Sequence, residues 1–94
     1  MNIETLQNLK ESIITELKEK GYSKIGKYGL RIKFAEILRM PEKSSFILNL
    51  VNKFMEEENI KMVGNSLEGD CEYLYSGNLH FNSVSKLKEY YRIK

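Results

Sequence analysis

Several residue types that build functional sites are scarce in this sequence: tryptophan is absent, and cysteine, histidine and proline occur once each. With Cys71 as the only cysteine, the chain can form neither an intrachain disulfide nor a cysteine cluster. With His80 as the only histidine and no ligand pattern around it, the sequence predicts no zinc site, no other metal site and no cofactor.

Long apolar runs are also missing. Polar residues interrupt the first apolar positions, Leu6 and Leu9, so we expect no signal peptide. No segment approaches the roughly eighteen consecutive apolar residues of a membrane span, so we expect no membrane partner. A lone thiol is typical of a reducing compartment, and the predicted location is the cytoplasm.

Catalytic motifs are not recognisable either. Gly64 and Gly69 flank a polar loop that lacks the Lys-Ser/Thr ending of a phosphate-binding loop. The three glutamates at 56–58 are consecutive, so on a helix they splay around most of a turn and do not converge on a metal ion. No Ser-His-Asp arrangement and no acid–base pair of carboxylates stands out. The sequence therefore predicts a protein that is not an enzyme.

The chain has 94 residues, of which 41% are apolar and 11% aromatic. That length supports one domain with a modest core, and stability at this size often depends on a partner chain.

The net charge of +2 conceals an uneven distribution. Residues 20–53 hold six Lys and two Arg against two Glu, a net +6, and residues 83–94 hold +3. Residues 1–19 carry −2, and residues 54–82 carry −5. A basic block of this kind is either a solvated surface or a site for a polyanion such as nucleic acid.

Apolar spacing predicts a helix over 3–20, with Gly21 at its C-terminal cap. Three glycines indicate a loop over 21–29, with a short extended piece at 23–25. The next segment is ambiguous, because residues 30–34 alternate as a half-buried strand does, whereas the pattern over 30–39 has helical spacing. We favour a helix over 30–39, because the helical spacing continues through residues 37 and 38.

Pro41 ends that helix, and Ser44 or Ser45 is expected to cap the next one, which runs to Asn59. Phe46, with five further apolar residues, forms one wholly apolar face of it. The remaining expected elements are a strand at 60–63, a turn-rich loop at 64–70, a strand at 71–75, a short extended piece at 79–81 and a helix over 83–92.

This order of elements, mostly α with a small β-hairpin, resembles the small winged helix-turn-helix proteins of phages, plasmids and archaeal mobile elements. Ala35 stands where the family has a small residue at the helix crossing, and Phe46 or Ile47 stands at the buried anchor of the second helix. The resemblance implies one domain, with a helix-turn-helix core at about 30–59, a wing at about 60–76 and a C-terminal helix at about 83–92. Arg39 replaces a common glycine, and residues 40–43 indicate a longer turn than usual.

The resemblance implies that the second helix of the pair reads the major groove of double-stranded DNA with its N-terminal residues. Its outward positions are short and rich in amides, and Asn can bond the N6 and N7 edge of adenine. The basic residues before it would contact phosphates, which position a protein without reading sequence. The predicted DNA-binding residues are Lys24, Lys27, Tyr28, Arg31, Lys33, Arg39, Lys43, Ser44, Ser45, Asn49, Asn52 and Lys53.

The resemblance further implies sequence-specific binding, as a transcriptional regulator or as a partition-site (centromere-binding) protein in plasmid or phage DNA segregation. We expect a homodimer whose seam uses the terminal helices, because tyrosine suits an interface that stays partly wet. The acidic wing, with Glu68, Asp70 and Glu72, would repel phosphates. The alternative is therefore a protein-binding module, such as a phage-encoded inhibitor of a host nuclease or CRISPR complex. The predicted dimer residues are Val84, Leu87, Tyr90 and Tyr91.

Overall fold

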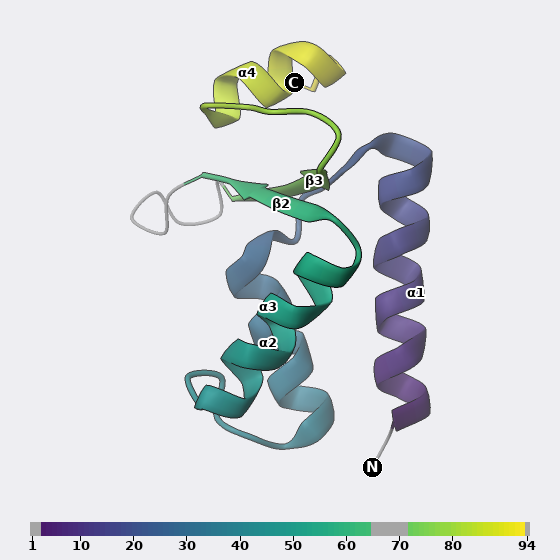
Figure 1. Ribbon diagram of the computed structural model, residues 1–94, viewed down its shortest axis with the longest axis vertical. Coiled ribbons are helices and arrows are strands. Elements are labelled where there is room, and N and C mark those ends of the chain that lie inside the picture. Colours follow the sequence, from purple (N-terminus) through teal and green to yellow (C-terminus); the bar gives the residue numbers. More distant parts are fainter. Residues whose placement is uncertain (1–2, 65–71, 94) are drawn as a thin grey trace.

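The protein is mostly helical with a small antiparallel sheet, as seen in a computed structural model that describes residues 3–64 and 72–93. Helices α1, α2 and α3 lie on one side of the sheet and α4 lies on the other (Figure 1). In chain order the elements are α1 (Ile3–Lys20), β1 (Tyr22–Ser23), α2 (Gly26–Leu38), α3 (Ser45–Glu57), β2 (Ile60–Val63), β3 (Tyr73–Ser76) and α4 (Val84–Tyr91).

The sheet has the strand order β1-β3-β2, and both pairings are antiparallel. Strand β3 is the centre: Tyr75 lies opposite Tyr22 of β1 and opposite Lys61 of β2. The third strand, β1, corresponds to the short extended piece predicted at 23–25 and begins one residue earlier, whereas its place in the sheet was not predicted. Residues 79–81, the other predicted extended piece, form no strand.

The two faces of the sheet bury different side chains, because alternate residues of a strand point to opposite faces. Leu74 faces the helices and belongs to a cluster with Leu30, Phe34, Ile47 and other residues of α1–α3. Tyr73 and Tyr75 belong to a second cluster with Leu87 of α4. The helical side therefore has a mainly aliphatic core, and the α4 side has a core rich in aromatic residues.

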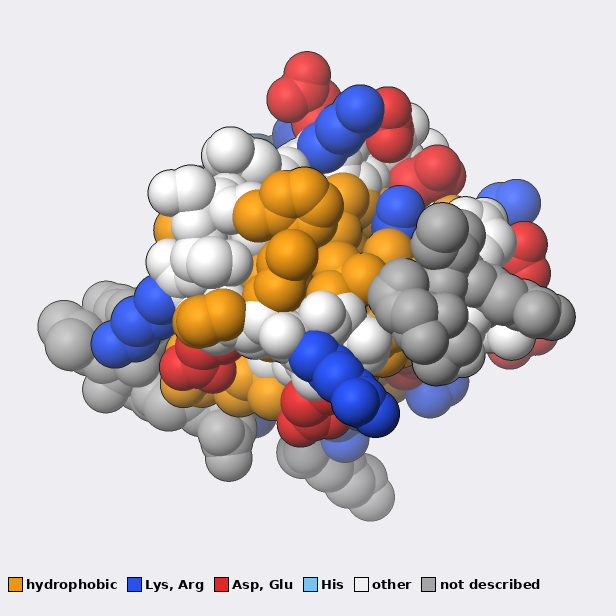
Figure 2. All heavy atoms as spheres, turned by 90° about the horizontal axis from the view of Figure 1, so that it is seen from below, with side chains coloured by type: hydrophobic (Ala, Val, Ile, Leu, Met, Phe, Trp, Pro, Cys, Tyr) orange, Lys and Arg blue, Asp and Glu red, His pale blue; other side chains and the backbone are white. Residues whose placement is uncertain are grey.

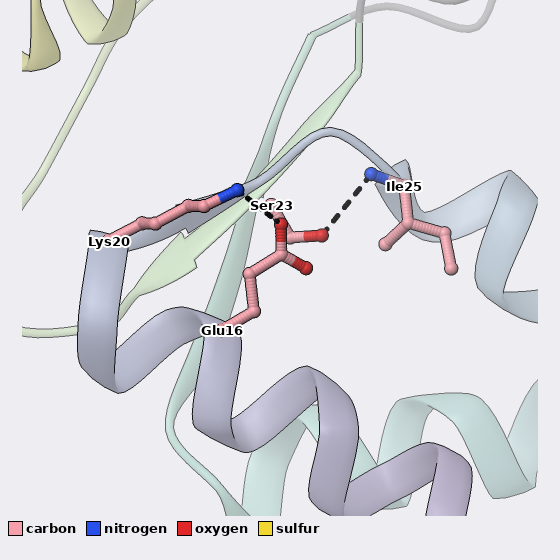
Figure 3. Close-up of polar contacts among 4 residues, drawn as sticks. All are labelled: Glu16, Lys20, Ser23 and Ile25. Atoms are coloured by element: carbon pink, nitrogen blue, oxygen red, sulfur yellow. Dashed lines mark hydrogen bonds and ion pairs between the residues drawn. The ribbon is translucent and has the colours of Figure 1, made fainter.

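The connection from α1 to α2 is short and hydrogen-bonded. The Gly21 N–H donates to the Leu17 carbonyl at 2.8 Å, and Gly21 has a positive φ of 89°, which glycine adopts without strain. Lys20 and Glu16 form an ion pair at 3.5 Å, one turn apart (Figure 3). The buried Ser23 Oγ accepts a hydrogen bond from the Ile25 N–H at 3.3 Å, which turns the chain into α2 (Figure 3).

Helix α2 begins at Gly26, four residues before the predicted start, and residues 30–34 are helical, so the strand alternative is wrong. The cause is tertiary. Glu72, just before β3, accepts a hydrogen bond on Oε1 from the Tyr28 N–H at 3.2 Å, which caps the first turn from a distant part of the chain. Gly26 has φ 70°, and a Cβ there would lie 2.9 Å from the Glu72 Cβ. Local sequence pattern carries no sign of either contact.

The turn between α2 and α3 is long, as the residues around Pro41 predict. Arg39 adopts the left-handed conformation with φ 55° and ψ 49°, and its N–H donates to the Ala35 carbonyl. This is the position that glycine usually takes at a helix end. Helix α3 then begins with Ser44 as its cap, whose Oγ accepts a hydrogen bond from the Ile47 N–H at 3.3 Å.

Within residues 3–64 and 72–93, no helix combines the length and the apolar character needed to cross a membrane.

Candidate functional site

Helix α3 presents a polar face along its first two turns. Ile47, Val51 and Phe54 point into the aliphatic core, whereas Ser45, Asn49, Asn52 and Lys53 are exposed. From position 43 to position 55 the chain holds Lys43 and Lys53 and no carboxylate, while positions 56–58 are all glutamate. The N-terminal part of this surface is therefore neutral to basic, and the positive end of the helix dipole adds to that character.

Phe46 departs from the prediction that it lies on the inner apolar face. Its side chain is 56% exposed, and Ile47 takes the buried anchor position. The six apolar residues of α3 span too wide an arc for all of them to face one core. Phe46 is the member at the edge of that arc next to Lys53.

Ser44 was predicted both as a cap of α3 and as a DNA-binding residue, and the structure shows it in the capping role. Its hydroxyl oxygen caps α3, and such a cap typically contributes about 1 kcal/mol of stability. The Ser44 side chain is therefore a structural element of the helix start. Ser45, which is exposed, is the serine whose hydroxyl faces solvent.

Arg31 is held on the side of α2 that carries Tyr28. Its guanidinium carbon lies 5.2 Å from the centroid of the Tyr28 ring, within cation–π range. The Tyr28 hydroxyl donates to Glu42 Oε1 at 3.2 Å, which ties the ring to the turn before α3. Arg31 Nε is buried and has no hydrogen-bond partner among the described residues. The arginine is thus oriented by stacking, and none of the described carboxylates forms an ion pair with it.

Lys33 does not join this surface. Two residues on a helix differ by about 200° in direction, so Lys33 points away from Arg31. It lines a hollow between α1 and α2 together with Thr5, Asn8 and Ser12. Of the other predicted cations, Lys27 is partly buried in the first turn of α2, and the exposed ones are Lys24 before α2 and Arg39 and Lys43 in the turn before α3.

Glu72 was expected to be an acidic residue of the wing that repels phosphates, and this is wrong. Its side chain is only 9% exposed and is used at the start of α2. The other two acidic residues of that prediction, Glu68 and Asp70, lie outside the described residues, as does most of the predicted 64–70 loop.

Lys10 is a cation beside α3 that the sequence analysis did not select. Its Nζ lies 5.7 Å from the centroid of the Phe54 ring. The sequence spacing could have predicted this position of Lys10. It is four residues after Leu6 and four before Ile14, in the inward apolar stripe of α1. A lysine in such a stripe lays its methylene groups along the core and brings its charge to the rim.

The predicted dimer seam on α4 is wrong for Leu87, which is fully buried inside the chain. Val84 and Tyr91 pack against the same aromatic cluster, and the Tyr91 hydroxyl donates to the Gly21 carbonyl at 3.2 Å. These side chains hold α4 on its own sheet. Tyr90, at 59% exposed, is the one of the four that faces solvent.

Among the residues that the structure describes, no group of three or more His, Cys, Asp or Glu side chains is arranged to hold a metal ion. Comparison with known proteins gives no match to a family model, to a curated protein or to a solved structure.

Proposed function

We propose that this protein is a winged helix-turn-helix that binds double-stranded DNA in a sequence-specific way, with the N-terminal half of α3 in the major groove. The observation that carries the proposal is the exposed face of α3 formed by Ser45, Asn49, Asn52 and Lys53. The opposite face of the helix is buried against the core, and the exposed face contains no carboxylate. Amides and hydroxyls at the start of a helix suit base edges, and the flanking cations suit phosphates.

The order of elements supports the same proposal. A helix, a short strand, two helices and an antiparallel hairpin follow one another, with the first strand paired to the second strand of the hairpin. In this arrangement β2 and β3 correspond to the wing. The task in the cell would be transcriptional regulation or DNA segregation at a partition site, and either one follows from sequence-specific binding.

Arg31 and Lys33 provide a matched pair for the test, because they lie two residues apart on opposite sides of α2. We expect Arg31→Ala to weaken binding to random duplex DNA and to lower the slope of log K against log salt by about 0.9, the value for one lost phosphate contact. Lys33→Ala should leave both quantities close to those of the wild type. Fluorescence anisotropy titrations at several salt concentrations measure both.

Equal losses of DNA affinity in the two variants would show that only the overall charge matters and that the surface beside α3 is not the binding site. A wild-type affinity that hardly changes with salt would contradict a site built on phosphate contacts, and no measurable affinity for duplex DNA would contradict DNA binding itself. Thermal melts of both variants check that the fold is intact, since surface changes usually alter stability by only about 0.5 kcal/mol.

A second candidate is a protein-binding module, as an inhibitor of a host nuclease or CRISPR complex would be. One observation favours it: apolar atoms form a continuous area on the end of the molecule that Figure 2 shows. Two large apolar side chains, Phe46 in α3 and Met40 in the turn before it, are exposed. The burial of Glu72 weakens it, because that residue was one of the three acidic wing residues on which the alternative was based.

A further inference from the structure

Phe46 is the exposed aromatic side chain of α3, and its position is specific. It is the second residue of the helix and is 56% exposed. Around the helix axis it lies about 60° from Asn49 and about 20° from Lys53. A phenylalanine is therefore presented to solvent on the same part of the helix as an amide and a cation.

The surroundings of Phe46 define the chemistry of what it can contact. Leu50, one turn further on, is partly buried and packs against the core, whereas Phe46 is exposed. Lys43 and Lys53 lie before and after it, and the nearest glutamate in α3 is ten residues away, at Glu56. Glu42, in the turn before α3, accepts the hydrogen bond of the Tyr28 hydroxyl. The positive end of the helix dipole is also here. Such a surface suits a ligand that is anionic and also offers an apolar group.

The major groove of DNA has that combination. Phosphates line it, and the C5-methyl group of thymine is the apolar group that a base pair displays there. Phenylalanine is among the side chains that contact this methyl group. Asn49 is close to Phe46 on the helix surface, and its amide suits the N6 and N7 atoms of adenine. One short segment of α3 therefore offers groups for both bases of an A·T base pair.

We propose that Phe46 is a specificity-determining residue that packs against the C5-methyl group of a thymine in the bound DNA. The proposal rests on the DNA binding proposed above, and it adds the base chemistry that α3 recognises. It also accounts for a large apolar side chain that the fold leaves in solvent at the start of this helix.

The test replaces thymine with uracil, which lacks only that methyl group. The probe is a duplex that the wild-type protein selects from a random pool, with each thymine changed to uracil in turn. At one or two positions we expect the wild type to lose about fourfold in affinity, the factor for one buried methyl-sized group. Phe46→Ala should bind the thymine and uracil duplexes equally at those positions. Phe46→Leu, which stays apolar, should keep part of the preference.

Met40→Ala is the matched control, because it removes another exposed apolar side chain from the turn before α3 and should keep the full preference for thymine. If wild type and Phe46→Ala respond to uracil alike, while both still bind the selected duplex, the proposal for Phe46 is overturned and DNA binding stands. If the pool yields no preferred sequence, sequence-specific binding fails and this proposal fails with it.

Discussion

The sheet separates two apolar clusters that differ in chemistry and in what they support. On the helical side, Leu30, Phe34, Ile47 and Leu74 are fully buried and hold α2 and α3 in a fixed relation. On the α4 side the cluster is largely aromatic, and two of its hydroxyls make hydrogen bonds to backbone groups. The first core positions the candidate site. The second attaches α4, a short helix that lies on the other side of the sheet from α2 and α3 (Figure 1).

The largest expected effects on stability come from truncating one buried leucine to alanine on each side of the sheet. Leu74 and Leu87 are both fully buried. Leu→Ala at a buried site costs about 2–5 kcal/mol, and the cost grows with the cavity that remains. We expect Leu74→Ala near the upper end, because helices and strands surround the site. Leu87→Ala should be near the lower end, because an eight-residue helix can shift to fill the space. Urea denaturation measures both.

Hydrogen exchange sharpens this comparison. In Leu74→Ala we expect amide protection to fall in α2 and α3 together, since these helices share one core. In Leu87→Ala we expect protection to fall in α4 and to persist in α2 and α3. An equal loss in all four helices after Leu87→Ala would mean that the two clusters unfold as one unit.

A smaller effect is expected at Glu72, which precedes β3 and caps α2. Hydrogen bonds to a charged group contribute about 1.5–3 kcal/mol, so Glu72→Ala should destabilise the protein by about 2 kcal/mol. Glu72→Gln keeps an acceptor and should lose roughly half as much, since neutral hydrogen bonds are about half as strong as charge-assisted ones. Denaturant titration gives the size, and exchange of the first amides of α2 gives the location. A Glu72→Gln variant with unchanged stability and tighter DNA binding would instead fit a carboxylate exposed on a wing.

The local sequence pattern was sufficient to predict an element when the residues that define its start, end and buried face lie within that element. The apolar spacing of α1, the Ser44 cap of α3 and the short β2 run all lie within the segments they define, and their predicted bounds agree with the structure to within a few residues. The start of α2 and strand β1 depend on β3, which follows them by some fifty residues. No window of sequence contains both partners, so the early start of α2 and the pairing of β1 with β3 were not predictable, although a short extended piece was expected at 23–25.

The candidate site was predictable in part. The exposed positions Ser45, Asn49, Asn52 and Lys53 agree with the predicted outward face of α3. Lys33 was selected for its charge alone, and charge does not reveal which side of a helix a residue occupies. Phe46 was predicted to face the core because it is apolar. The six apolar residues of α3, however, span a wider arc of the helix than the core can cover. The homodimer stays a prediction, with Tyr90 as the exposed aromatic residue of the proposed seam.

The smallest expected effect concerns Tyr91, in the aromatic cluster. Tyr91→Phe removes the hydrogen bond to the Gly21 carbonyl and should cost about 1 kcal/mol at neutral pH. Burial raises the pKa of Tyr91 above its ordinary value, and the neighbouring Tyr90 and Tyr75 raise it further. The folded state therefore favours the neutral phenol. Its contribution is fully present below the unfolded pKa, about 10, and is lost as pH rises through the higher folded pKa.

The wild type should consequently lose more stability than Tyr91→Phe as pH rises above about 10, so the difference between the two proteins shrinks there. Urea titrations of both proteins at neutral and alkaline pH measure that difference directly, because the shared loss from other groups cancels. A gap between wild type and Tyr91→Phe that stays constant across this range would show that ionisation of Tyr91 is not linked to folding, and it would contradict the raised pKa.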